Sequence, residues 1–114
     1  MQASSMRLAL IADLHGHADM LSRALAVCRA QGVEAIVFLG DIIDRDDQAN
    51  ACVEALRGWP AFGVYGNHER QLVAALVMGA HHGLKPEAHD FFSALEPRLV
   101  MGDVCFVHDE LDGQ

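Results

Sequence analysis

Residues 36–45 read IVFLGDIIDR, an apolar run that ends on two carboxylates and an arginine. A short continuous apolar run is typical of a strand buried on both faces of a parallel sheet. Three further runs end in the same way: Leu8–Ala12 before Asp13 and His15, Phe62–Gly66 before Asn67 and His68, and Val104–Val107 before His108. In open α/β sheets, ligands bind at the edge formed by the carboxyl ends of the strands. We therefore expect these polar side chains to gather at one edge of a sheet.

The spacing of apolar residues predicts alternating strands and helices. Strands are expected at Arg7–Ala12, Val33–Leu39 and Ala61–Tyr65, and helices at Asp19–Ala30, Gln48–Arg57, Glu69–Met78 and Pro86–Leu95. This order is the βαβαβ pattern of a parallel sheet covered by helices. Arg98–Met101 and Val104–Val107 flank Gly102–Asp103, which suits an antiparallel hairpin with a two-residue turn. We predict an α/β fold with a mixed sheet and covering helices, in a single domain over residues 1–114.

Length and composition exclude several classes of protein. The chain has 114 residues, of which 52% are hydrophobic, and this is enough for a folded core. Its formal net charge of −8 includes only eight Lys and Arg residues, which argues against nucleic-acid binding. The apolar runs are far shorter than the roughly 20 residues of a membrane span, so we expect no membrane segment. The sequence also has no glycine-rich loop ending in Gly-Lys-Ser or Gly-Lys-Thr, so a P-loop nucleotide-binding protein is not favoured.

The cysteines indicate the compartment. Cys28, Cys52 and Cys105 are an odd number, and each stands among apolar residues. Buried, reduced thiols are the expectation that follows from this pattern. Because the first residues do not resemble a signal peptide either, we expect a cytoplasmic protein.

The first two strand ends carry groups suited to divalent metal ions. Asp13-Leu14-His15-Gly16-His17 places a carboxylate and an imidazole two residues apart, with a glycine that lets the backbone bend around an ion. An equally good explanation of this segment alone is a helix N-cap with solvent-facing histidines. In the second segment, Asp41 is placed to bridge two metal ions, and Arg45 to bind phosphate oxygens with its planar fork. The alternative there is a surface charge patch around residues 44–46.

The third and fourth strand ends add further ligand types. Gly66-Asn67-His68-Glu69 supplies an amide oxygen and a second imidazole. Helix capping alone does not explain this segment, because Asn67 by itself would cap a helix as well as the three polar groups together. His108 completes the set, and its alternative is a strand-end histidine without a function.

Three motifs follow one another in this sequence: Asp-x-His, Gly-Asp-x-x-Asp-Arg and Gly-Asn-His-Glu. In this order and spacing they resemble the motifs of the calcineurin-like metallophosphoesterase family, and the resemblance covers essentially the whole chain. The Asp-Arg and His-Glu endings are most similar to the branch that contains serine/threonine protein phosphatases and symmetrical dinucleoside-tetraphosphatases. The resemblance implies an αββα sandwich, of which this chain would be the N-terminal half.

The resemblance also implies a role for individual residues. Asp13 and His15 would hold one metal ion, Asp41 would bridge both ions, and Asn67 and His108 would hold the second. His68 would donate a proton to the leaving oxygen, with Asp44 as its orienting partner and Arg45 in contact with the phosphate.

Two metal ions about 3.5–4 Å apart can activate a water molecule for in-line attack on phosphorus, so the resemblance implies a metal-dependent phosphoester hydrolase. Mixed carboxylate, amide and imidazole ligands favour Mn, Fe or Zn. Protein phosphate, a nucleotide or a small-molecule ester would each be a substrate of the expected class.

The sequence also departs from the family pattern. Relatives carry further histidines in a later Gly-x-His pattern and strands for a second sheet, and neither is found here. The chain is therefore expected to be truncated, or to have its open sheet face covered by a second copy in a homo-oligomer. The alternative function is a catalytically impaired fragment, or a phosphate- or metal-binding module that lacks the C-terminal metal ligands.

Overall fold

Three parallel strands form the centre of the computed structural model, which describes residues 6–79 and 83–108. Strands β1 (Leu8–Ile11), β2 (Ala35–Leu39) and β3 (Ala61–Val64) lie in the order β1-β2-β3. Helix α1 (Ala18–Ala30) connects β1 to β2, and helix α2 (Ala49–Ala55) connects β2 to β3. The predicted α/β class and βαβαβ order are confirmed. Residues 1–5, 80–82 and 109–114 of the predicted domain lie outside the described residues.

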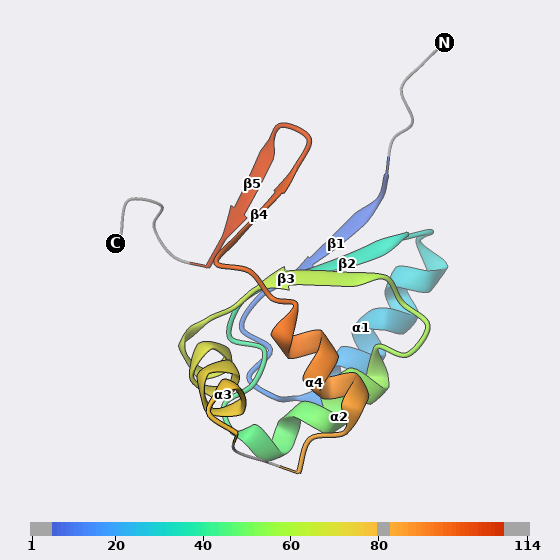
Figure 1. Ribbon diagram of the computed structural model, residues 1–114. Helices are drawn as coiled ribbons and strands as arrows, with labels where there is room; N and C mark the ends of the chain where they lie inside the picture. The colour runs from blue at the N-terminus through green and yellow to red at the C-terminus, as the bar shows by residue number, and fades with distance from the viewer. Residues whose placement is uncertain (1–5, 80–82, 109–114) are drawn as a thin grey trace.

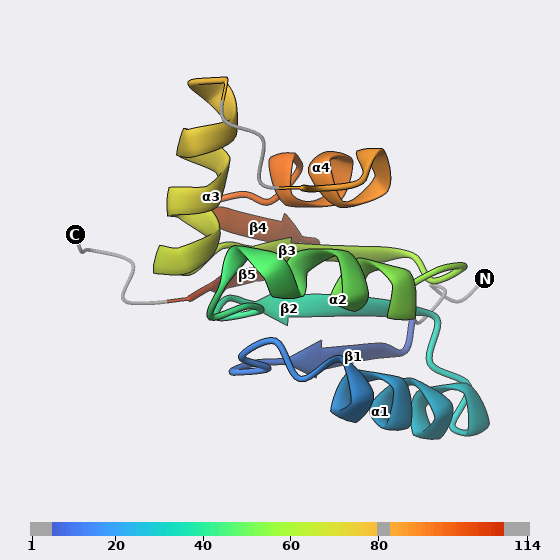
Figure 2. The same ribbon diagram turned by 90° about the horizontal axis from the view of Figure 1, so that it is seen from below.

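Helices cover one face of this sheet, as Figures 1 and 2 show for α1, α2 and α4 (Pro86–Ser93). Ile36 and Phe38 of β2 point into the core on this side, and both are fully buried. They pack with apolar side chains from each helix, among them Leu21, Leu25, Cys52 and Phe92. The apolar run of β2 is therefore the middle of the core, as its composition predicts.

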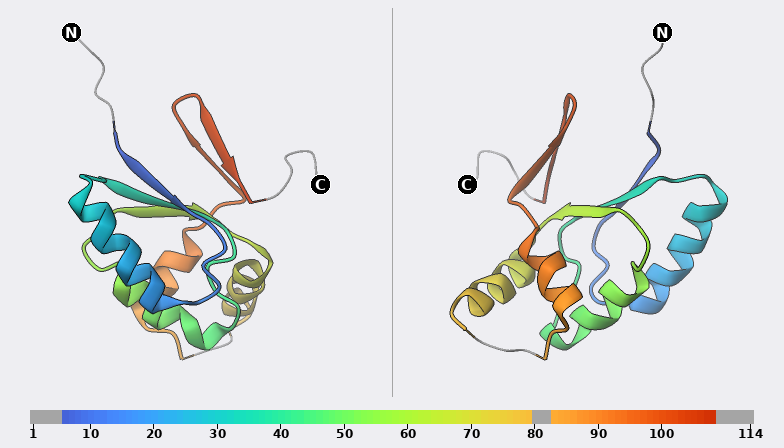
Figure 3. Two further views of the ribbon diagram at one scale, coloured as in Figure 1. Left: turned by 180° about the vertical axis from the view of Figure 1, so that it is seen from behind. Right: turned by 45° about the vertical axis from the view of Figure 1, so that its right-hand side comes forward.

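The opposite face of the sheet is more open. Leu10, Val37 and Phe62 are register partners in one row across β1, β2 and β3. Val37 is fully buried in the middle of the row, while Leu10 and Phe62 are 54% and 43% exposed. This is the face on which the C-terminal hairpin stands, as the two views of Figure 3 show.

The hairpin consists of β4 (Arg98–Met101) and β5 (Val104–Val107), which pair antiparallel as predicted. It forms a two-stranded sheet of its own, so the described strands make two sheets where one mixed sheet was predicted. Glu96 runs beside β3 in a single parallel bridge to Val64. The next residue is Pro97, which has no N–H with which to extend that ladder. The chain therefore leaves the edge of β3 before the hairpin begins.

Helix boundaries differ from the prediction at two functionally important places. A short 3-10 turn, η1 (Asp46–Gln48), precedes α2 directly after the Gly-Asp-x-x-Asp-Arg motif. Helix α3 (Asn67–Val77) begins two residues earlier than predicted, so Asn67 and His68 belong to its first turn. None of the described helices is long and apolar enough to cross a membrane.

The three cysteines form no disulfide with one another, and they are not equally buried. Cys52 on α2 is buried, Cys28 on α1 is partly buried, and Cys105 on β5 is exposed. The prediction of a buried thiol at Cys105 is wrong because the hairpin that carries it projects away from the helix-covered core (Figure 1).

Candidate metal centre

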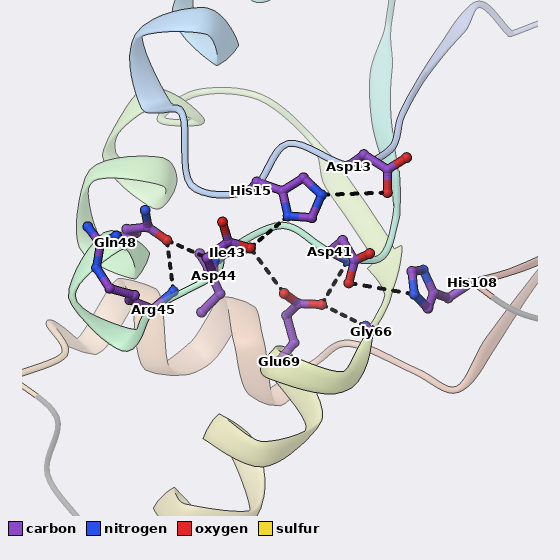
Figure 4. Close-up of polar contacts among 10 residues, drawn as sticks. All are labelled: Asp13, His15, Asp41, Ile43, Asp44, Arg45, Gln48, Gly66, Glu69 and His108. Carbon is purple, nitrogen blue, oxygen red and sulfur yellow. Dashed lines mark hydrogen bonds and ion pairs between the residues drawn. The ribbon is translucent and has the colours of Figure 1, made fainter.

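The loops that follow β1, β2 and β3 lie side by side at one edge of the parallel sheet (Figure 4). Each of Asp13, His15 and Asp41 offers one ligand atom, and these atoms all lie within 4.8 Å of one another. Backbone hydrogen bonds join the first two loops: the N–H of His15 donates to Asp41 O at 2.9 Å, and the N–H of Gly16 donates to Ile42 O at 2.7 Å. The polar residues predicted at the ends of β1 and β2 therefore lie close together.

The backbone is strained at each member of this cluster. Asp13, His15 and Asp41 have φ values of 57°, 53° and 53°, in the left-handed region. For a residue other than glycine this conformation costs roughly 1–2 kcal/mol. Such strain is concentrated at functional sites, where the surrounding structure enforces it. All three members of the cluster therefore share a backbone conformation that is unfavourable for residues other than glycine.

The imidazole of His15 lies between two carboxylates. Its Nδ1 atom is 2.7 Å from Oδ1 of Asp44, and its Nε2 atom is 4.0 Å from Oδ1 of Asp13. The hydrogen bond to Asp44 raises the pKa of His15 above its usual value of 6.5, burial lowers this pKa, and the charges of Asp44, Asp41 and Asp13 raise it further. The site is thus one of concentrated negative charge.

His108 reaches the same edge from the end of β5. Its Nδ1 atom is 2.8 Å from the carbonyl oxygen of Leu39, and its Nε2 atom is 3.6 Å from Oδ1 of Asp41. Because a carbonyl oxygen only accepts hydrogen bonds, Nδ1 must carry the hydrogen, and in the neutral ring Nε2 keeps a free electron pair. Gly40 makes room for the ring, since a Cβ at this position would lie 2.6 Å from Cγ of His108.

The two imidazoles share one arrangement. In both His15 and His108, Nδ1 is bound to an oxygen atom and Nε2 faces an aspartate of the cluster. Histidines that bind metal ions are oriented in this way, with the second ring nitrogen fixed by a carboxylate or a backbone carbonyl. Ligand types predicted at three of the strand ends are therefore close together, and both imidazoles turn Nε2 toward a carboxylate.

Glu69 is a member of this site that the sequence analysis did not assign. Its side chain is fully buried. The carboxylate accepts hydrogen bonds from the N–H groups of Gly66, Asp41 and Ile43, at 2.6, 3.0 and 3.0 Å (Figure 4). The spacing from Gly66 to Glu69 is that of a capping box, which was the available signal. The two bonds to the loop after β2 have no such signal in the sequence.

Gln48 was missed as well. Its Oε1 atom accepts hydrogen bonds from the N–H groups of Asp44 and Arg45, both at 2.8 Å. Its side chain also packs against Gly16, where any Cβ would overlap the carboxamide. Gln48 therefore joins the loop of the first motif to the loop of the second.

The residues predicted to act in catalysis are not assembled as the resemblance implies. Asp44, expected to orient His68, is bound to His15. Arg45, expected to contact phosphate, is exposed, and its Nε atom donates to Asp47 at 3.1 Å. His68 and Asn67 are exposed in the first turn of α3.

Comparisons with known proteins identify the family of the chain. The sequence model of the calcineurin-like phosphoesterase family matches residues 6–112. The chain is 34% identical over 62 residues to an uncharacterized protein of Methanocaldococcus jannaschii, which covers 54% of this chain and 26% of that protein. It is also 34% identical over 67 residues to serine/threonine-protein phosphatase 1 of Salmonella typhimurium, which covers 58% of this chain and 31% of that protein.

A solved structure supports the same fold. The crystal structure of a metallophosphoesterase from Sphaerobacter thermophilus matches with a TM-score of 0.59 and 24% sequence identity, over 90% of this chain and 46% of that one. The chain thus spans about a quarter to a third of the curated relatives and about half of this structural neighbour. Because the family match extends over nearly all of the sequence and the fold agrees with it, the chain belongs to the calcineurin-like phosphoesterase family.

Proposed function

We propose that the protein is a metal-dependent phosphoester hydrolase whose metal ions bind at the edge formed by Asp13, His15, Asp41, Asn67 and His108. The observation that carries this proposal is the shared orientation of the two imidazoles, each with Nδ1 bound to oxygen and Nε2 facing a carboxylate. When bound, two divalent ions supply positive charge that lowers the pKa of a water molecule and stabilises the charge developing on the phosphate oxygens.

The residues fit such ions chemically. Asp13, His15 and Asp41 would hold the first ion, and Asp41, Asn67 and His108 the second. Carboxylate and imidazole ligands suit Mn, Fe and Zn, and the described residues offer no cysteine near this edge. The clustered aspartates gain most from a bound cation, since they otherwise repel one another.

The remaining residues of the site act on the substrate. His68 is exposed in the first turn of α3 and is proposed to donate a proton to the leaving oxygen. Arg45 is proposed to bind phosphate oxygens in a bidentate manner, which requires it to exchange Asp47 for the substrate. The similarity to a serine/threonine-protein phosphatase supports a phosphoprotein as the first substrate to test, with nucleotides and small esters as comparisons.

The proposal is tested with the Mn²⁺-loaded protein and p-nitrophenyl phosphate. Hydrolysis is expected in the wild type and should fall by two or more orders of magnitude in Asp41→Ala and His68→Ala, because each removes a group that acts directly. His89→Ala and Asp90→Ala on the exposed side of α4 are matched controls that should keep full activity. Equal turnover by the wild type and both site variants would overturn the proposal.

A second candidate function is a metal- and phosphate-binding module without turnover. The observation in its favour is that Asp13, His15, Asp41 and His108 lie close together, whereas Asp44 and Arg45 are bound to His15 and Asp47. Isothermal titration with Mn²⁺ and then with inorganic phosphate distinguishes the two functions. Binding of both, together with no hydrolysis of any ester, would favour the module.

A further inference from the structure

The fully buried Glu69 carboxylate joins two loops that are far apart in the sequence. It accepts one hydrogen bond from Gly66, next to Asn67, and two from Asp41 and Ile43, 28 and 26 residues earlier in the chain. We propose that Glu69 is a positioning residue that sets the relative placement of the loops after β2 and β3, which carry the proposed metal ligands Asp41 and Asn67. This inference rests on the proposed function, because it concerns the ligands of the same metal ions.

Helix capping alone does not account for this arrangement. In a capping box the glutamate makes one bond back to the N–H of the N-cap residue; here the N–H of Gly66 donates to Glu69 at 2.6 Å, and glycine has no side chain for the reciprocal bond. The two further bonds go to the loop after β2, where they contribute nothing to the start of α3. A carboxylate also binds backbone N–H groups about twice as strongly as a neutral acceptor does. Glu69 is therefore a link between the second and third motifs.

These bonds restrain the backbone conformation of Asp41. Its carboxylate holds the N–H groups of Asp41 and Ile43, on either side of the strained backbone at Asp41, where φ is 53°. Asp41 would hold both of the proposed ions, so a change in its orientation would affect both sites together. Gly66 allows the close approach, because a Cβ there would lie 2.6 Å from Oδ1 of Asp41.

Glu69→Gln tests the inference with the smallest change in shape. The amide oxygen of glutamine is able to replace the atom that accepts from Gly66 and Asp41, whereas the amide nitrogen would face the N–H of Ile43, donor against donor. We expect the Mn²⁺ dissociation constant, measured by isothermal titration well below the Tm, to rise by about 10–100-fold. In the metal-free protein, amide hydrogen exchange at Ile43 should become faster by at least tenfold.

Leu72→Ala is the matched control. Leu72 lies one turn further along α3 and is almost fully buried in the core, so its truncation lowers the Tm without removing a hydrogen bond to either loop. If Glu69 only contributed to the stability of the fold, Glu69→Gln and Leu72→Ala would weaken Mn²⁺ binding equally for an equal loss of Tm. Glu69→Asp, which keeps both oxygens on a shorter stem, is expected to bind Mn²⁺ between the wild type and Glu69→Gln.

The outcomes separate this inference from the proposed function. If the wild type binds no Mn²⁺, the proposed function fails and this inference fails with it. If the wild type binds Mn²⁺ and Glu69→Gln binds it equally well, only the inference is overturned. If neither Glu69 variant folds, amide exchange in the wild type decides: protection of Asp41 and Ile43 without metal supports the inference, and exchange at the rate of an unstructured chain overturns it.

Discussion

The Nδ1 atom of His15 lies 2.7 Å from Oδ1 of Asp44, so the carboxylate expected to orient a catalytic histidine is bound to a proposed metal ligand instead. The bond fixes which ring nitrogen of His15 faces Asp13, and it leaves Nε2 directed at the cluster. In this structure Asp44 therefore contacts a proposed metal ligand.

The first prediction concerns the titration of His15 in the metal-free protein. The pKa of His15 should lie above 6.5, chiefly because Asp44 accepts its hydrogen bond, and Asp44→Asn should lower it toward 6.5. Histidine NMR signals followed across pH measure the pKa directly. Asp47→Asn is the control, since Asp47 pairs with Arg45 and should leave the His15 titration unchanged.

The same bond makes stability depend on pH with a definite sign. A histidine whose pKa is raised on folding stabilises the protein fully below its unfolded value of about 6.5, and this stabilisation is lost as pH rises through the raised value. The Tm difference between the metal-free wild type and Asp44→Asn should therefore be largest at acid pH and should shrink toward pH 8. A difference that grows with pH would contradict the pairing.

The second prediction concerns Gln48, whose Oε1 atom accepts hydrogen bonds from the N–H groups of Asp44 and Arg45. Gln48→Leu removes the acceptor and should cost about 1 kcal/mol of folding free energy, measured by thermal unfolding. It should also weaken Mn²⁺ binding, because Asp44 then no longer holds His15 in place. Gln48→Glu keeps a side-chain oxygen at the same distance and should restore both properties. Equal losses of stability and of Mn²⁺ binding in the two variants would show that these properties do not depend on the side-chain oxygen atom.

The arrangement of the strands could be predicted because it depends on patterns that the sequence carries directly. Apolar runs of strand length, separated by helices, require a parallel sheet, and a parallel sheet brings the ends of its strands to one edge. Asp13, His15 and Asp41 come together for this reason. His108 arrives from the separate hairpin, which brings its ring back to the end of β2.

The choice of partners within the site could not be predicted in the same way. Asp44 was expected beside His68 and is bound to His15, and the backbone of the two loops that meet there is left-handed at His15 and Asp41. No periodicity encodes those φ values. The departure of the hairpin from the parallel sheet was likewise missed because it depends on one residue, Pro97, next to the last bridge of β3.

The third prediction concerns the thiols. Burial raises the pKa of Cys52 to about 11, so this thiol should not react with Ellman's reagent in the folded protein at pH 8. The exposed Cys105 should react fastest, and the partly buried Cys28 more slowly. Cys105→Ser should remove the fast phase alone, and the reaction of Cys52 should appear only in denaturant. A fast phase that persists in Cys105→Ser would contradict the exposure of the hairpin.

The fourth prediction separates backbone strain from displacement of His108. Gly40 and Gly58 have φ values of 97° and 84°, so alanine at either position costs roughly 1–2 kcal/mol through the left-handed backbone. A Cβ at Gly58 would meet no atom within 4 Å, whereas a Cβ at Gly40 would overlap the ring of His108. Both variants should therefore lower the Tm, but only Gly40→Ala should break the bond from His108 to Leu39 O and move Nε2 away from Asp41. The measurement is the number of Mn²⁺ ions bound at equal free metal: Gly58→Ala should match the wild type, and Gly40→Ala should lose the ion held by His108. Equal metal content in the two variants would mean that His108 is not a ligand, because the overlap leaves its ring no room in its present position.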